Sequence, residues 1–234
     1  MPIYSGPAAQ SGVRVLSEYM RQVYLWMCVG LGVTSIVAYG VANSPSISNL
    51  ILGNTLVFIM LVVAQFALVI ALSAAIDKLS AGMATGLFIL YSALTGATIS
   101  SIFIYYPIAS IGMAFLVTCC MFGAMTVYGF VTKRDLTSFG SFLFMGLIGI
   151  IVAMIVNIFL KSSMMNFIVC CLGVLIFTGL TAYDTQRIAR FGEDAPEGDA
   201  VAMRRGAILG ALTLYLDFIN IFLMLVQLFG GNRE

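Results

Sequence analysis

Residues 206–229 of this chain read GAILGALTLYLDFINIFLMLVQLF, an apolar run that contains one carboxylate. A helix of about 20 apolar residues crosses the core of a bilayer, so this run is long enough to span a membrane. Asp217 lies near its middle, at a depth of roughly 17 Å for a rise of 1.5 Å per residue. A charged side chain is costly at this depth and is rarely there without a function. The stretch therefore predicts a membrane helix with a functional aspartate.

One face of this predicted helix is small and polar. Its members recur at spacings of three and four residues, which places them on one side of a helix. They are Gly206, Gly210, Thr213, Asp217, Asn220, Met224 and Gln227. Such a face turns toward other helices rather than toward lipid. We therefore expect residues 206–229 to form the central helix.

The rest of the chain is also strongly apolar. Its residues are 61% hydrophobic and 9% charged, whereas soluble domains are about 25% charged. Six further runs have the length of a membrane helix, at residues 22–43, 55–76, 83–105, 108–131, 139–160 and 164–183. The sequence therefore predicts an all-α integral membrane protein of seven transmembrane helices, the last central and wrapped by the other six.

Lysine and arginine positions predict the orientation, because these residues favour cytoplasmic connections. With the N-terminus inside, nine of the 11 basic residues lie on the inner side, and Lys161 and Arg233 lie outside. We expect a cytoplasmic tail at residues 1–21, a seven-helix domain at 22–230 and an outward-facing tail at 231–234. The first apolar run is longer than the core of a signal peptide, so we expect it to be retained.

A second aspartate, Asp184, closes the sixth apolar run. Because the last two spans are consecutive, they are antiparallel, and each carries an acid on a polar face. If Asp184 and Asp217 met, both could not easily ionise, and the pair would titrate as a unit. A shared proton would hold the helices together, and its loss would add repulsion and create a cation site. Since the chain has no histidine, this pair is the best candidate for a pH sensor and ion gate.

Other polar residues accompany the two acids. Thr181, Thr213 and Asn220 share their helix faces and offer further oxygen ligands for a cation. Lys78 and Arg187 are candidate basic partners. An alternative interpretation places Asp184 in water at the end of its span, with Arg187 one turn further on.

Small and polar stripes in the third and fifth spans are typical of helix packing. The third span carries Ser92, Gly96 and Ser100, and the fifth carries Gly146, Gly149, Ala153 and Asn157. We interpret both stripes as packing surfaces rather than as sites.

Several functional classes lack their residues in this sequence. Without histidine, a nucleophile–base pair or a phosphate-binding glycine loop, we expect no enzyme and no cofactor. A net charge of +1 gives no general attraction to nucleic acid. The five cysteines lie within apolar runs, and an odd number there does not indicate a disulfide framework.

Four motifs are distinctive. They are LTGATISSIF at residues 94–103, FGAM at 122–125 followed by TKRDL at 132–136, GLTAYDTQ at 179–186 and GALTLYLDFIN at 210–220. Together they resemble the Bax inhibitor-1 family, also called the transmembrane Bax-inhibitor-motif family. The similarity covers about residues 19–230 and is closest to short bacterial inner-membrane members.

The resemblance implies a seven-helix fold whose last helix is wrapped by the other six. It also implies a pH-sensitive calcium leak gated by two aspartates, which match Asp184 and Asp217. Calcium, protons and the lipid bilayer are then the expected partners, and the two aspartates are candidate calcium ligands. Some members carry an acid in the second span, where this chain has only Gln65.

Two other functions remain open. A proton-coupled cation carrier would also use a membrane acid pair, and it would move ions against their gradient. A non-transporting protein that modulates a membrane protease or another complex is the second alternative, since some bacterial relatives are associated with that role. In that case, changing the aspartates to asparagine would leave the phenotype intact.

Overall fold

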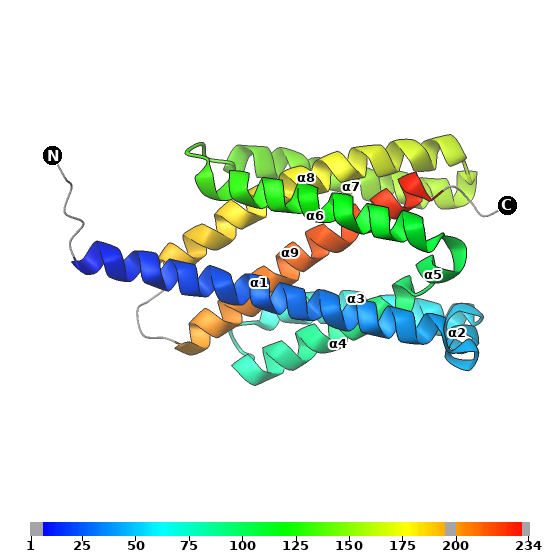
Figure 1. Cartoon of the computed structure of the whole chain (residues 1–234), viewed down its shortest axis with the longest axis horizontal. Coiled ribbons are helices and arrows are strands. Elements are labelled where there is room, and N and C mark those ends of the chain that lie inside the picture. Colours follow the sequence, from blue (N-terminus) through cyan, green and yellow to red (C-terminus); the bar gives the residue numbers. More distant parts are fainter. Residues whose placement is uncertain (1–6, 195–199, 231–234) are drawn as a thin grey trace. The chain divides into compact units, whose positions relative to one another are not determined.

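The computed structural model describes residues 7–194 and 200–230, and its regular structure in these ranges is helical (Figure 1). The helices are α1 (Pro7–Ala42), α2 (Pro45–Leu52), α3 (Thr55–Ala75), α4 (Ala81–Ile99), α5 (Ile102–Tyr105), α6 (Ile108–Val131), α7 (Thr137–Leu160), α8 (Ser163–Asp194) and α9 (Ala200–Phe229). Of the two short helices, α2 lies in the connection between α1 and α3, and α5 extends the segment that begins with α4.

Seven of these helices are long and apolar enough to cross a membrane, as predicted. They are α1, α3, α6, α7, α8, α9 and the segment Ala81–Tyr105, which joins α4 to α5. The last span is the most buried, with 72% of its apolar window inside the protein, whereas the other six range from 6% to 50%. The predicted all-α membrane fold with a buried last helix is therefore confirmed.

Two helices extend beyond the apolar runs that predict them. The run at 164–183 is too short as a helix prediction, because α8 continues through Asp184 to Asp194. Charged residues lower hydropathy here, but Gln, Arg and Ala are good helix formers, and the helix continues into the polar region. Helix α1 likewise begins at Pro7, within the segment expected to be a tail. The C-terminal tail at 231–234 lies outside the described residues.

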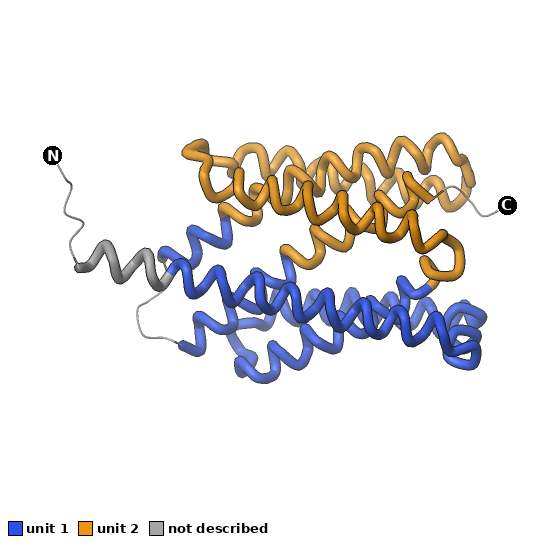
Figure 2. Tube along the Cα trace, viewed as in Figure 1, with its two compact units in different colours: residues 1–100, 187–213 blue, residues 101–186, 214–234 orange. Residues whose placement is uncertain are grey.

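The chain forms two compact units, drawn in different colours in Figure 2. Unit 1 comprises Met1–Ser100 and Arg187–Thr213. Within it α1 packs closely on α4, because Gly30 leaves room for the Phe88 ring and the hydroxyl of Thr34 donates to the carbonyl of Ser92 at 2.9 Å. Gly96 of α4 lies against the backbone of Thr34, as expected for a packing stripe.

Unit 2 comprises Ser101–Gln186 and Leu214–Glu234, and so contains both aspartates. It joins α6 and α7 to the first part of α8 and the last part of α9. Edge-to-face contacts join Phe122 of α6 to Phe218 of α9 and Phe115 to both Phe218 and Phe222, with ring centroids 5.5–6.2 Å apart. On α7, a side chain at Gly146 would meet Ile176 of α8, which fits the predicted packing role of that stripe.

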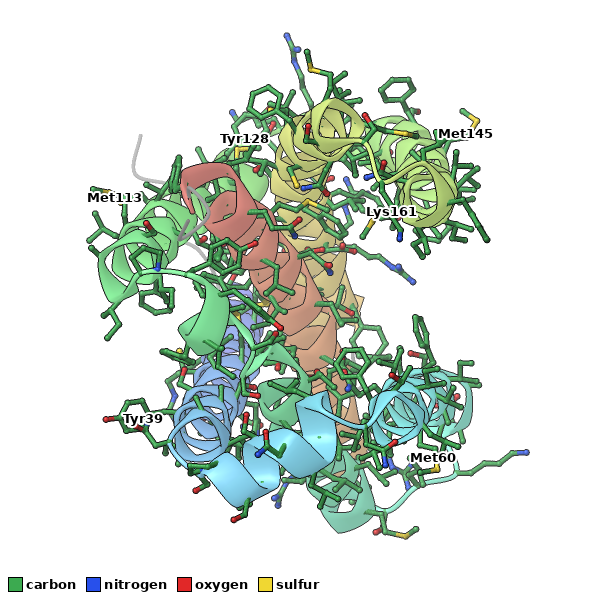
Figure 3. The ribbon with its side chains drawn as sticks, turned by 90° about the vertical axis from the view of Figure 1, so that its right-hand side faces the viewer. Tyr39, Met60, Met113, Tyr128, Met145 and Lys161 are labelled. Atoms are coloured by element: carbon green, nitrogen blue, oxygen red, sulfur yellow. The ribbon has the colours of Figure 1, made fainter. Side chains whose placement is uncertain are left out.

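Large apolar side chains cover the outside of each unit. In Figure 3, Tyr39 and Met60 point outward from unit 1, and Met113, Tyr128 and Met145 point outward from unit 2. These side chains are between 45% and 67% exposed. An apolar exterior of this extent is the surface that lipid tails cover.

Candidate functional site

The site is built from the α8 and α9 segments of unit 2. Asp217 lies in the interior of α9, between Leu214 and Ile221, both of which are fully buried. The Asp217 side chain is itself 4% exposed, and its Oδ2 atom has no hydrogen-bond partner among the residues that the structure describes. A carboxyl oxygen that is buried without a partner is costly, and the cost falls when the oxygen is protonated or is bound by water or a cation.

Asp184 lies next to Asp217. It is 8% exposed and belongs to the continuous helix α8, ten residues before that helix ends at Asp194. It is the charged neighbour of Asp217, and a side-chain hydrogen bond joins the two residues. The alternative of a solvated carboxylate at the end of a span therefore does not fit the burial of Asp184.

The three supporting residues predicted from the sequence lie on the same two helices. Thr181 is fully buried one turn before Asp184, and Thr213 and Asn220 lie one turn to either side of Asp217. Each donates to the backbone of its own helix: Thr181 to Phe177, Thr213 to Leu209 and Asn220 to Leu216, at 2.8–3.1 Å. Since the donors are used in this way, lone pairs of the side-chain oxygens stay available to a cation.

Both candidate basic partners, Lys78 and Arg187, have exposed side chains. The charged group that acts on Asp217 is Asp184 rather than a lysine or arginine. A basic partner for the aspartate pair stays a prediction.

Gln186 joins α8 to the connection between α6 and α7, a role that sequence reasoning did not assign. Its side-chain oxygen accepts from the amide of Leu136 at 3.0 Å, and its nitrogen donates to the carbonyl of Arg134 at 2.9 Å. The motifs TKRDL and GLTAYDTQ are thus joined by hydrogen bonds. The presence of both motifs in the sequence was the feature from which this contact could have been inferred. This link fixes the backbone two residues beyond Asp184.

Helix α6 approaches α8 closely beside the same acid. A side-chain carbon at Gly129 would lie 2.6 Å from the carbonyl oxygen of Ala182 and 3.1 Å from the Cβ of Thr185. The hydroxyls of Thr185 and Thr126 are buried, and neither has a hydrogen-bond partner among the described residues. Sequence reasoning included Thr185 only as part of the motif GLTAYDTQ and missed Thr126, since a single threonine on an apolar helix is usually a packing residue.

Gln65, the polar residue of the second span, is already engaged within unit 1. Its amide nitrogen donates to the carbonyl of Leu94 at 3.4 Å and to the hydroxyl of Thr98 at 3.3 Å, and Thr95 donates to its oxygen at 3.4 Å. The residue therefore holds α3 against α4.

An apolar cavity of about 500 Å³ lies between α7 and α8. It is lined by small residues of α7, among them Gly149 and Ala153, and by larger residues of α8, among them Met165 and Leu172. Because this lining offers almost no polar atoms, the cavity does not suit an ion, which needs several oxygen ligands.

Comparisons with known proteins agree with these motifs. The family described as inhibitor of apoptosis-promoting Bax1 matches residues 16–234. The chain is 56% identical over 218 residues to the inner membrane protein YbhL of Escherichia coli K12, which covers 93% of each chain. It is 43% identical over 222 residues to an uncharacterised protein of Borreliella burgdorferi, covering 95% of each, and 41% identical over 216 residues to one of Deinococcus radiodurans, covering 92% and 91%.

The family match covers nearly the whole chain and includes the segments that carry Asp184 and Asp217. The chain is therefore an integral membrane protein that belongs to the Bax inhibitor family.

Proposed function

We propose that the protein is a pH-sensitive calcium leak of a bacterial inner membrane, gated by Asp184 and Asp217. The observation that carries the proposal is the meeting of two buried carboxyl groups within unit 2. Two such groups that interact directly share one proton more easily than they both ionise. The proton bridges α8 and α9, and its loss leaves two negative charges side by side.

Deprotonation has two consequences in this arrangement. Repulsion between the carboxylates weakens the contact of α8 with α9, and the same oxygens become ligands for a divalent cation. The unpartnered Oδ2 of Asp217 is the first such ligand. Flux is therefore expected to rise as the pH increases and the shared proton is lost.

The number of ligands favours transport over storage. A tight calcium site uses six to eight oxygen ligands, several of them carboxylates. Among the described residues there is no cluster of three or more acidic, cysteine or histidine side chains. Two carboxylates supported by Thr181 and Asn220 of the same unit form a weaker site, from which an ion can leave quickly.

The proposal is tested by calcium entry into liposomes that contain the purified protein, measured over a range of pH on each side. Wild type is compared with Asp217→Asn and with the control Asp77→Asn, which makes the same chemical change at an exposed position. We expect pH-dependent flux in wild type and in the control, and pH-independent flux in Asp217→Asn.

Other outcomes separate the competing functions. Calcium movement against its gradient, driven by an imposed proton gradient, would indicate a proton-coupled carrier instead. Absence of flux at every pH would overturn the leak and favour a modulator of a membrane protease or other complex. That role predicts that a deletion phenotype is rescued fully by Asp184→Asn and Asp217→Asn.

A further inference from the structure

Three groups of contacts between α8 and α9 in unit 2 lie at successive levels along the two antiparallel helices. At the first level Asp184 meets Asp217. At the second level Gly173 faces Met224, and at the third Asn166 and Cys170 meet Gln227. As the residue number falls along α8 it rises along α9, so the three levels follow one continuous face of each helix. We call this line of contacts the α8–α9 seam.

The third level is polar and open to its surroundings. The oxygen of Gln227 accepts from the amide of Asn166 at 3.3 Å and from the thiol of Cys170 at 3.6 Å. The side chains of Asn166 and Gln227 are exposed. This outer polar cluster lies about 15 Å from Asp217 along α9, at 1.5 Å per residue over ten residues. The seam is thus polar at both of its ends.

The second level is apolar and closed. A side-chain carbon at Gly173 would collide with the thioether of Met224 and lie 2.5 Å from its methyl group, so Met224 occupies the space that a side chain at 173 would fill. Met224 is 6% exposed, and Phe177, one turn from Gly173 toward Asp184 on the same face, is 7% exposed. An apolar layer therefore separates the two polar ends of the seam.

Met224 interrupts the polar face of α9. That face carries the polar residues Thr213, Asp217, Asn220 and Gln227, and Met224 is the apolar residue between Asn220 and Gln227. A narrow apolar segment in an otherwise polar path stops ions because water leaves it, which is how hydrophobic gates close. Methionine is also flexible and can vacate such a space by rotating its side chain.

We propose that Met224, seated on Gly173, is the hydrophobic barrier that closes the outer half of the ion path. This inference rests on the proposed function, because it assigns the path between the aspartate pair and the outer polar cluster. Ions that reach Asp184 and Asp217 stop at Met224 until α8 and α9 separate.

The barrier is tested by thiol labelling, which does not depend on calcium flux. In a background with the five native cysteines replaced, single cysteines are introduced as Asn220→Cys, on the aspartate side of Met224, or Gln227→Cys, on its outer side. A charged, membrane-impermeant thiol reagent is then applied to sealed vesicles from the side that labels Gln227→Cys. We expect rapid reaction of Gln227→Cys and slow reaction of Asn220→Cys.

Substitutions at Met224 then show whether the barrier depends on the size of this side chain or on its apolar character. Met224→Ala removes the bulk of the barrier, and Met224→Gln keeps a similar length while making it polar. Both should accelerate labelling of Asn220→Cys several-fold, whereas the control Met224→Leu should leave it slow. If Gln227→Cys is labelled from one side of the membrane and not from the other, the variant is folded and inserted. Rapid labelling of Asn220→Cys with Met224 present, or no acceleration in either opened variant, would overturn the barrier.

Calcium flux in the same variants distinguishes this inference from the proposed function. If both hold, Met224→Ala and Met224→Gln raise the flux several-fold. If labelling accelerates while no variant passes calcium, the barrier stands and the calcium leak fails. If wild type shows pH-dependent flux but the variants change neither labelling nor flux, the leak stands and the barrier is overturned.

Discussion

Helices α7 and α9 are both apolar enough to cross a membrane, yet they differ in where their residues lie. In α7, 11% of the apolar window is buried, whereas in α9 the share is 72%, although α7 has the higher mean hydropathy. The reason is that polar residues in a membrane must turn toward protein, while apolar residues are equally stable against lipid. In this chain the less hydropathic helix is therefore the buried one, and it carries the aspartate.

The largest effect is expected from the two acids of the buried pair. Asp184→Asn and Asp217→Asn should each abolish the pH dependence of calcium flux, because each leaves a single carboxyl that no longer shares a proton. For wild type we expect a change of up to about tenfold per pH unit, the limit for one titrating proton. The double variant should behave like either single one, since the two residues act as a unit.

Flux measured for both single variants and the double variant checks this expectation. Additive effects of the two substitutions would show that Asp184 and Asp217 titrate independently, so that burial in α9 would not create a shared-proton site.

The next effect tests burial directly, with the same substitution on both helices. Ile221 of α9 is fully buried, and Ile155 of α7 is 52% exposed. Ile221→Ala should destabilise the protein by about 2 kcal/mol through lost packing. This value is near the low end for buried residues, because in lipid an apolar side chain gains no free energy from leaving water. Ile155→Ala should cost less than about 0.5 kcal/mol.

Equilibrium unfolding in mixed micelles measures both costs. Equal costs at the two positions would mean that α7 is buried as deeply as α9, for example against a second protein.

A smaller effect is expected where α6 meets α8 beside Asp184. Gly129→Ala should destabilise by about 1–2 kcal/mol, because the new carbon would meet the rigid backbone carbonyl of Ala182. Gly123→Ala on the same helix meets nothing within 4 Å and should be neutral or slightly stabilising, since alanine favours helix more than glycine does. Thermal unfolding of the two variants provides the measurement, and an equal loss in both would contradict the close approach at Gly129.

The fold and the candidate role of the two aspartates could be predicted because both follow from patterns within single helices. Length and hydropathy define seven spans, and the spacing of Asp217 with its polar neighbours identifies the buried face of α9. The full length of α8 was not predictable in this way, because hydropathy falls at Asp184 although the helix continues to Asp194. The sequence therefore predicted Asp184 at the end of a span, whereas in the structure it lies in the interior of α8.

Contacts between helices were the other part that the sequence did not predict. The helical spacing placed Met224 on the polar face of its helix, but it did not show that Met224 would lie against Gly173. Likewise, Gln186 was only a motif residue until the structure placed it on the connection between α6 and α7. Such pairs depend on the register between two helices, which the periodicity of one helix does not contain.

The smallest effect concerns this connection. Gln186→Ala removes the acceptor of the Leu136 amide and the donor to Arg134, and it should cost about 1 kcal/mol. Hydrogen exchange at the Leu136 amide should become faster, while the control Ser141→Ala, which loses only a bond within its own helix, should leave it unchanged. Unchanged exchange in Gln186→Ala would show that the connection is held by other contacts.

The most direct test of the central claim, that Asp184 and Asp217 hold one proton between them, is an infrared titration of the carboxyl groups in reconstituted protein. We expect a protonated-carboxyl stretch in wild type that disappears as the pH rises, over the range in which calcium flux increases, and that is altered in Asp217→Asn and in Asp184→Asn alike. A stretch that is the same in wild type and in both variants, or that disappears over a pH range in which flux does not change, would show that the two aspartates do not share the proton that controls the flux.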